Sequence, residues 1–443
     1  MVEANIKIIE ELKMVVDLFK TDVKLRSLVT NGESDFSRNR KLPFERVVSI
    51  ILNMPKRSLS IEIQDFFNHI ESEVKSCSKG AFSLQRSKLK SLFFDFWNNQ
   101  FVNSFYTHYG TKSKKWKGFI LQAVDGSTAY LFNKKEVVDY FGTQGNQHVS
   151  VPMAQIVQIQ DVLNEITVWG NISPINDSEV TVISNNIRHF RKDSLTLFDR
   201  GFPSFSLMYI LLNEEKPLHF LMRCRKNFNR EVIEFLKSKE RSKELTFSPT
   251  AEAMETLRKL GYIVTRKQTI TIRAVKVKLS TGEDEILLTN LFDQEAYTLD
   301  DLKELYALRW GIETAFGKQK NQQQMEQFSG HKVISIQQDY AATLMISNLQ
   351  SLIEKQSDEY LKAINTSRKH DYKINKNISW HHLKHNVVKL FLENEPKQIL
   401  MKLQNAFEKN LEPIRPNRSY TRDKKSKRFK GKYQTLTNYK RAV

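Results

Sequence analysis

One stretch of the chain, residues 302–320, most constrains what the chain can fold into. It reads LKELYALRWGIETAFGKQK, and its apolar residues recur at the spacing of one helix face. On a helix that turns about 100° per residue, four polar side chains share an arc of roughly 60°, and these are Tyr306, Arg309, Glu313 and Lys320. The stretch therefore predicts a single helix that packs its apolar arc on a sheet and half shelters this polar stripe.

Two interpretations of the stripe compete. Arg309 and Glu313 are four residues apart, which is also the spacing of an ordinary ion pair on a surface helix. However, the order Tyr-x2-Arg-x3-Glu-x6-Lys resembles the signature of the IS4-family (Tn5-like) transposases, and every position of that signature is matched here. The resemblance implies that Glu313 is a catalytic, metal-binding carboxylate and that Tyr306, Arg309 and Lys320 contact DNA phosphates.

Two aspartates upstream each follow a short apolar run. Residues 119–124 (FILQAV) lead into Asp125, and residues 195–198 (LTLF) lead into Asp199. We interpret both runs as buried strands, because functional side chains of open α/β sheets emerge at the carboxyl ends of strands. An Asp-Gly pair after a strand is also a common turn, but both motifs resemble the first and second acidic motifs of the same family. A catalytic site of Asp125, Asp199 and Glu313 is therefore predicted.

Three carboxylates in one pocket suit a pair of divalent cations about 3.5 to 4 Å apart. Oxygen ligands favour Mg²⁺, and we expect Mn²⁺ to substitute. One ion would activate a water, and later a DNA 3′-hydroxyl, while the other would stabilise the leaving 3′-oxygen. Arg309 would grip the scissile region most firmly, because its fork can bind two phosphate oxygens. The predicted reaction is metal-dependent cleavage at transposon ends followed by strand transfer into target DNA.

Two other functions remain open at this point. A ribonuclease H-like DNA nuclease would use the same carboxylates without joining strands. A catalytically silent DNA-binding regulator derived from a transposase would retain DNA affinity alone. The resemblance further implies a hairpin intermediate and a homodimer that brings both transposon ends together, neither of which follows from residue chemistry.

The pattern of residues predicts an α/β protein in three parts. Residues 1–110 read as an all-helical domain, with one helix expected over 81–109 and a turn at 76–80 like that of a helix-turn-helix; it would either contact DNA or only support the fold. Residues 111–400 would form the catalytic domain, and the resemblance implies a ribonuclease H-like mixed sheet flanked by helices, with a β-rich insertion at about 225–285. Residues 401–443 would complete a helix and end in a basic tail.

The charge balance indicates the class of partner. Lys and Arg number 69 against 50 Asp and Glu, a formal net charge of +19. Such an excess favours a polyanion, and we expect double-stranded DNA, both transposon ends and target. The tail beyond Arg415 is rich in Lys and Arg with aromatic residues between them, so it is either a solvated segment or a phosphate-binding one.

Other features limit the remaining classes. Cys77 and Cys224 are the chain's two cysteines, which fits a reducing compartment and excludes a disulfide framework. No window approaches the roughly 20 apolar residues of a membrane span, and the first residues lack the apolar core of a signal peptide. His381 and His385 lack the HExxH pattern, so we expect no zinc there. We expect a bacterial cytoplasmic protein that is nucleoid-associated when bound to DNA, with no membrane partner.

Overall fold

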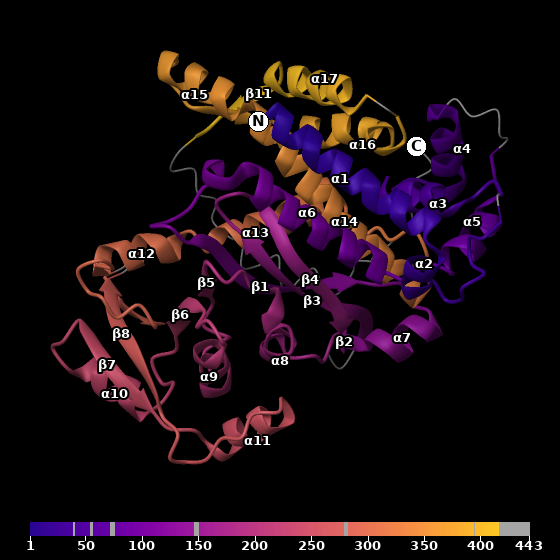
Figure 1. Ribbon diagram of the computed structural model, residues 1–443. Helices are drawn as coiled ribbons and strands as arrows, with labels where there is room; N and C mark the ends of the chain where they lie inside the picture. The colour runs from indigo at the N-terminus through magenta and orange to yellow at the C-terminus, as the bar shows by residue number, and fades with distance from the viewer. Residues whose placement is uncertain are drawn as a thin grey trace.

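The computed structural model describes residues 1–38, 40–53, 56–70, 76–145, 150–278, 282–393 and 395–415. Over these ranges the chain is a mixed α/β protein, as expected, with one large sheet and helices on both of its faces (Figure 1). Two buried apolar clusters lie against opposite faces: Val124 of the first long strand belongs to one, and its neighbour Ala123 belongs to the other. This alternation is the two-residue period of a strand that is covered on both sides.

The sheet combines parallel and antiparallel strands. Its order is β2-β3-β1-β5-β6-β9-β8-β7, with β4 paired to β3. β1 runs parallel to β5, and β5 runs parallel to β6, while the other pairs are antiparallel. The strand bounds are β1 Ile120–Tyr130, β2 Thr143–Gly145, β3 Ser150–Asp161, β4 Ile166–Pro174, β5 Ser194–Phe198, β6 His219–Cys224, β7 Ser242–Phe247, β8 Ile270–Lys278 and β9 Asp284–Thr289.

The expectation that the first strand ends at Asp125 is wrong, and the register shows why. The parallel pairing of β1 with β5 stops at Val124 and Phe198. β1 nevertheless continues for six residues, because β3 keeps pairing with it as far as Tyr130. Asp125 therefore lies inside a strand. It is nevertheless the first residue beyond the parallel pairing of β1 with β5, and a crevice can open where such a pairing ends.

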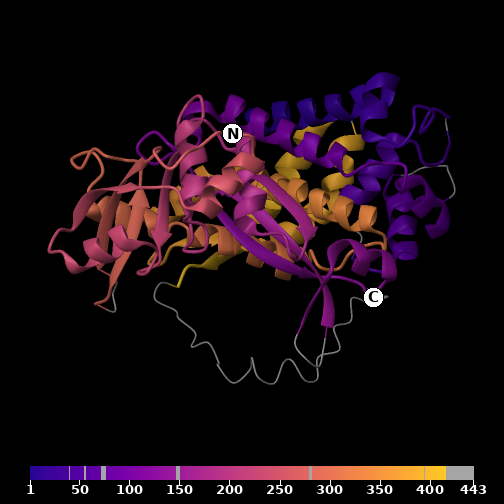
Figure 2. The ribbon, with the colours of Figure 1, turned by 90° about the horizontal axis from the view of Figure 1, so that it is seen from below.

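Strands of the expected insertion extend the main sheet. β9 pairs with β6, β8 pairs with β9, and β7 forms the edge, while α10 (Arg230–Lys237) and α11 (Ala251–Lys259) interrupt them. Figure 2 shows this region, in pink, at the end of the molecule opposite the first helices, in indigo. The domain boundaries drawn from the sequence stay a prediction.

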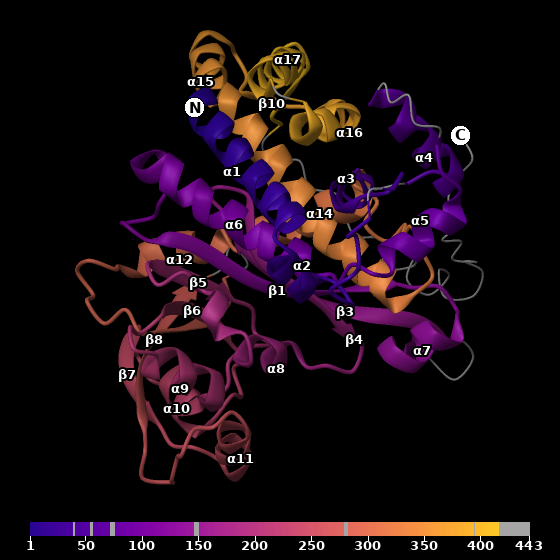
Figure 3. The same ribbon diagram turned by 45° about the vertical axis from the view of Figure 1, so that its right-hand side comes forward.

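Helices from both ends of the chain pack together on one face of the sheet. Figure 3 shows α1, α6 and α14 side by side there, and α1 also contacts α17. The N-terminal helices are α1 Val2–Thr21, α2 Val23–Val29, α3 Phe44–Leu52, α4 Leu59–His69, α5 Lys79–Arg86 and α6 Leu92–Tyr109. The later ones are α7 Lys135–Phe141, α8 Glu179–Ser184, α9 Phe205–Asn213, α12 Leu299–Ala307, α13 Trp310–Gly317, α14 Val333–Glu354, α15 Asp358–Ser367, α16 Lys376–Leu392 and α17 Pro396–Glu408, with a small sheet of β10 Tyr372–Ile374 and β11 Leu411–Pro413.

A single helix over residues 81–109 is also contradicted. The chain leaves the helix after Arg86 because its backbone pairs elsewhere: Lys90 N donates to Val29 O at 2.8 Å, and Asn31 N donates to Lys88 O at 3.0 Å. The basic tail from residue 416 onward lies outside the described residues. Among the helices of the described ranges, none combines the length and apolar content that a bilayer span needs.

Candidate active site at the end of the parallel strands

The stretch 302–320 is two helices and a π-turn, so the prediction of one continuous helix is wrong. α12 begins with a capping box at Thr298 and ends at Ala307, α13 follows from Trp310, and Lys318–Gln322 is π-helical. Between α12 and α13 the backbone tightens to i→i−3 bonds, including Arg309 N to Tyr306 O at 3.1 Å. At Gly311 an added Cβ would lie 2.9 Å from Val162, so this turn sits close against the end of β3.

Arg309 joins the first and third predicted carboxylates. Its Nη2 donates to Glu313 Oε1 at 2.7 Å, and its Nη1 lies 3.4 Å from Asp125 Oδ2. The guanidinium side chain is only 6% exposed, and its Nε has no hydrogen-bond partner. Two carboxylates from distant parts of the sequence thus face one buried cation, which goes beyond the local ion pair of a surface helix.

Asp199 joins this group through Tyr306. The aspartate directly follows β5, and the Tyr306 hydroxyl donates to its Oδ1 at 3.4 Å. Burial, and after it the charge of Asp199, raises the pKa of Tyr306 well above the usual range of a phenol. The phenol therefore stays a neutral hydrogen-bond donor, with the Arg309 guanidinium 6.0 Å from its ring centre.

Lys320 lies in the π-turn and reaches the same strand as Asp125. Its Nζ donates to the carbonyl oxygen of Thr128 at 2.5 Å. Burial lowers the pKa of this ammonium. The structure thus places Lys320 three residues along β1 from the first aspartate, and contact with DNA phosphate stays a prediction for it.

The electrostatics of Asp125 reflect too little positive charge around it. Burial raises the pKa of Asp125 to about 6, the Arg309 guanidinium opposes that shift, and the carboxylates of Glu179 and Glu313 add to it. A buried carboxyl with carboxylate neighbours favours its protonated form unless a further cation is bound.

Glu179 is an acidic neighbour that the sequence reading missed. It opens α8, and Gln155 Nε2 on β3 donates to its Oε1 at 3.0 Å. An added Cβ on Gly126 would lie 1.8 Å from that same oxygen, so the carboxylate rests against the backbone next to Asp125. The sequence carried no local signal for this role, because Glu179 lies in a segment that reads simply as a helix.

Arg223 is a second missed residue, and here a signal existed. The parallel pairing of β5 with β6 ends at Phe198 and Met222. Asp199 is the next residue after β5's last pair, and Arg223 is the next residue after β6's, so the two lie at the same level of the sheet. Its guanidinium forms an ion pair with Glu285 of β9. The charge of Asp199 contributes to raising the pKa of Glu285, and the charge of Glu285 contributes to raising that of Tyr306. The strand-end reasoning that found both aspartates would have found this arginine as well.

A family match covers the strands and helices that carry these residues. Residues 107–349 match the protein-family model described as "Transposase DDE domain". The chain belongs to this transposase family.

Two further likenesses accompany the family match. The putative transposase InsZ of Escherichia coli (strain K12) is 27% identical over 122 residues, which are 27% of this chain and 41% of InsZ. The chain thus matches about two fifths of the length of that relative. The cryo-EM structure of the piggyBac transposase synaptic complex with hairpin DNA superposes on 96% of this chain and 90% of that chain, with a TM-score of 0.43 and 12% identity.

The donor set of this transposase chain suits a hard divalent cation. All three predicted ligands are carboxylates, and Asp125 and Glu313 already face one cationic group. Within the described ranges, no three acidic, histidine or cysteine side chains are grouped closely enough to hold one ion as they stand. Mg²⁺ commonly takes one or two protein carboxylates and fills its shell with water and substrate phosphates. Asp125 and Glu313 are ligands of the type that such a site uses.

Proposed function

We propose that this protein is the transposase of an insertion sequence of the IS4 type, which cleaves DNA at transposon ends and transfers the strands into target DNA. Membership of the transposase DDE domain family supports the proposal. The observation that carries it furthest is the guanidinium of Arg309, which draws Asp125 and Glu313 together beside Asp199. The reaction type follows from those carboxylates, since hard cations bound to them serve phosphoryl transfer.

In this proposal Asp125, Asp199 and Glu313 hold two Mg²⁺ ions, for which Mn²⁺ substitutes. The ions supply an activated oxygen nucleophile and a stabilised leaving oxygen. Arg309 exchanges part of its bonding to the carboxylates for two phosphate oxygens, which its planar fork fits. The Tyr306 hydroxyl donates a hydrogen bond to a phosphate oxygen. Lys320, which now binds the carbonyl oxygen of Thr128, contributes a positive charge to the phosphate contact.

The partners and the fold family belong to the same proposal. We propose a ribonuclease H-like arrangement for β4, β3, β1, β5 and β6. In the sheet, β4, β3 and β1 are antiparallel neighbours, and β1, β5 and β6 are parallel neighbours. The excess of 69 basic over 50 acidic residues supports double-stranded DNA as the partner. A homodimer that holds both ends, and action in the bacterial cytoplasm at the nucleoid, complete the proposal.

The test compares two Glu→Gln variants from the same stretch. Glu313→Gln should lower Mg²⁺-dependent cleavage of a duplex containing the element's end by more than about 100-fold, beyond the range typical of groups that only orient metal ligands. The control is Glu304→Gln, because Glu304 is exposed on α12, and this variant should cut like the wild type. Undiminished cutting by Glu313→Gln would remove that residue from the mechanism, and a wild type that binds the duplex without cutting it would favour a silent regulator.

A further inference from the structure

Three side chains of the segment that follows α13, those of Lys318, Gln319 and Lys320, bind other parts of the protein. α13 ends at Gly317, and Lys318–Gln322 continues as a π-helix. Such wider turns occur in short pieces and are frequent at functional sites. Because this segment is the direct continuation of the helix that carries Glu313, its contacts with the sheet bear directly on where that carboxylate lies.

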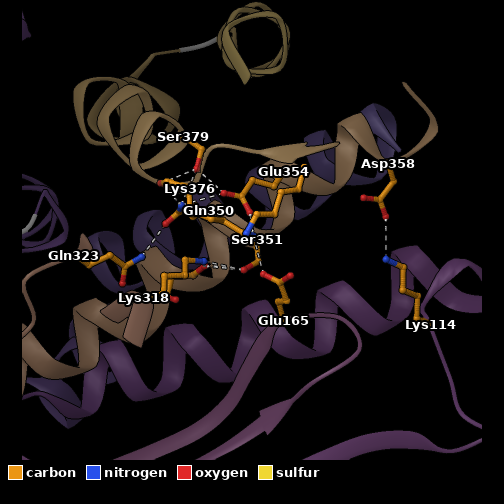
Figure 4. A network of polar contacts seen from close by, with 12 residues as sticks. Lys114, Glu165, Lys318, Gln323, Gln350, Ser351, Glu354, Asp358, Lys376 and Ser379 are labelled. Atoms are coloured by element: carbon orange, nitrogen blue, oxygen red, sulfur yellow. Dashed lines mark hydrogen bonds and ion pairs between the residues drawn. The ribbon is translucent and has the colours of Figure 1, made fainter. Parts of the chain in front are cut away.

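One set of bonds ties the segment to α14. Lys318 Nζ donates to Ser347 O at 3.3 Å and to Ser351 Oγ at 3.1 Å. Gln323 Nε2 donates to Gln350 Oε1 at 2.9 Å. Figure 4 shows that these contacts continue through Gln350 into a network with Glu354 and Lys376.

Gln319 makes a different contact, directed at the strand opposite Asp125. Gln158 Nε2 donates to Gln319 Oε1 at 2.7 Å, and Gln319 Nε2 donates back to Gln158 Oε1 at 3.3 Å. Both side chains are fully buried. Gln158 on β3 is the register partner of Asp125 on β1, and side chains directly opposite each other in antiparallel strands lie on the same face. The amide pair therefore links the neighbour of Asp125 to the helix of Glu313.

This pair has the properties of a positioning device. Apolar side chains would fill the same space, but two reciprocal hydrogen bonds fix direction and register, and a fully satisfied buried network is rigid. Gln158 is also braced from α14, because its Nε2 contacts Tyr340 Oη at 3.2 Å. We propose that Gln158 and Gln319 set the separation between Asp125 and Glu313, and thereby the geometry in which divalent metal binds. This inference rests on the proposed function.

The test uses two buried glutamines of the same segment as a matched pair. Gln319→Met and Gln323→Met each replace an amide by an unbranched apolar chain, and both residues are fully buried. Mn²⁺ binding to the full-length protein without DNA is measured by calorimetry, and thermal unfolding is measured alongside. Gln319→Met should lose more stability, because it breaks two hydrogen bonds, whereas Gln323→Met breaks one and also removes a buried oxygen that has no partner. Gln319→Met alone should weaken Mn²⁺ binding by about 10- to 100-fold, the range for residues that orient metal ligands.

Cleavage of the end-containing duplex gives an independent readout. Gln319→Met should cut slowly at low Mn²⁺ and recover as the Mn²⁺ concentration rises, whereas Gln323→Met should keep the wild-type dependence. If Gln319→Met does not fold, the double variant Gln158→Met/Gln319→Met, which leaves no member of the amide pair unmatched, carries the same expectation.

The outcomes separate the two proposals. Wild-type Mn²⁺ affinity in Gln319→Met, or an equal loss in Gln323→Met, overturns the positioning role while the proposed function stands. A wild type that neither binds Mn²⁺ nor cuts overturns the proposed function itself.

Discussion

The short stretch from Arg309 to Lys318 takes part in two charged clusters that are balanced in opposite ways. In the first, the Arg309 guanidinium contacts both Asp125 and Glu313. Its positive charge does not suffice, since burial and neighbouring carboxylates still raise the pKa of Asp125 to about 6.

In the second cluster the lysines match the carboxylates. Lys376 forms ion pairs with Glu354 and Glu165, and Lys318 lies beside them (Figure 4). The Glu165 side chain is 57% exposed. Although partial desolvation opposes the change, Lys376 and then Lys318 lower its pKa to about 2. A cluster whose charges are already matched serves structure, whereas one that holds excess negative charge favours an added cation and marks a candidate functional site.

The largest expected difference between the clusters comes from removing one carboxylate charge in each. Glu354→Gln should destabilise the protein by about 1 to 3 kcal/mol, because Lys376, whose side chain is 27% exposed, loses one of its two carboxylate partners. Asp125→Asn should leave stability equal or higher, because it relieves repulsion among carboxylates, yet lower cleavage by more than about 100-fold. Urea unfolding and end cleavage, measured on both variants, check this reversal.

Each variant serves as the control for the other. Under conditions in which it is folded, the Glu354→Gln variant should retain metal-dependent cleavage. Equal destabilisation by the two changes would mean that the carboxylate site is balanced internally, and the distinction between the clusters would be lost.

A second difference should be visible in the pH dependence of stability. The pKa of Asp125 is raised to about 6, against about 3.9 for an unfolded aspartate. The folded state thus binds that proton more tightly, so the carboxylate costs about 2 to 3 kcal/mol at pH 7, a cost that vanishes as the pH falls from about 6 to about 4. As the pH falls through this range, the free energy of unfolding of the wild type should rise by this amount relative to that of Asp125→Asn. Urea unfolding with a chelator present measures the difference.

Glu165 should behave in the opposite sense. Its pKa is lowered to about 2, so its contribution is complete above the unfolded value of about 4.3 and is lost as the pH falls towards 2. Glu165→Gln should remove that loss of stability at acid pH.

For Asp125, parallel pH profiles of the free energy of unfolding for the wild type and Asp125→Asn between pH 4 and 7 would contradict the excess of negative charge around that residue.

The sequence predicts the parts of the site that depend on local pattern. Asp125 and Asp199 stand out because each follows a short apolar run, and Glu313 stands out by its spacing from Arg309. The joint contact of Asp125 and Glu313 with Arg309 had no local signature beyond that spacing, since it depends on how α13 packs against β1.

The failures have long-range causes. The break before Trp310 lies where Gly311 closely approaches Val162, and periodicity within residues 302–320 carries no trace of that contact. The continuation of β1 past Asp125 depends on pairing with β3, which local propensity does not encode. Glu179 reaches the site only because β3 supplies Gln155 to hold it.

The smallest expected effect sharpens the comparison at the edge of the carboxylate site. Gly126→Ala places a Cβ where the Glu179 carboxylate now rests, 1.8 Å from its Oε1. Because that group is the far end of a flexible chain, it should swing away and lose its bond to Gln155, at a cost of about 1 kcal/mol. Moving one negative charge away from Asp125 should also lower the pKa of Asp125 in the folded state, and this makes its stability penalty smaller and complete at a lower pH. Urea unfolding of Gly126→Ala at several pH values checks both effects, and Gly201→Ala is the control, because an added Cβ there meets nothing within 4 Å. If Gly126→Ala matches that control, Glu179 does not contribute to the excess negative charge that separates this cluster from the balanced one.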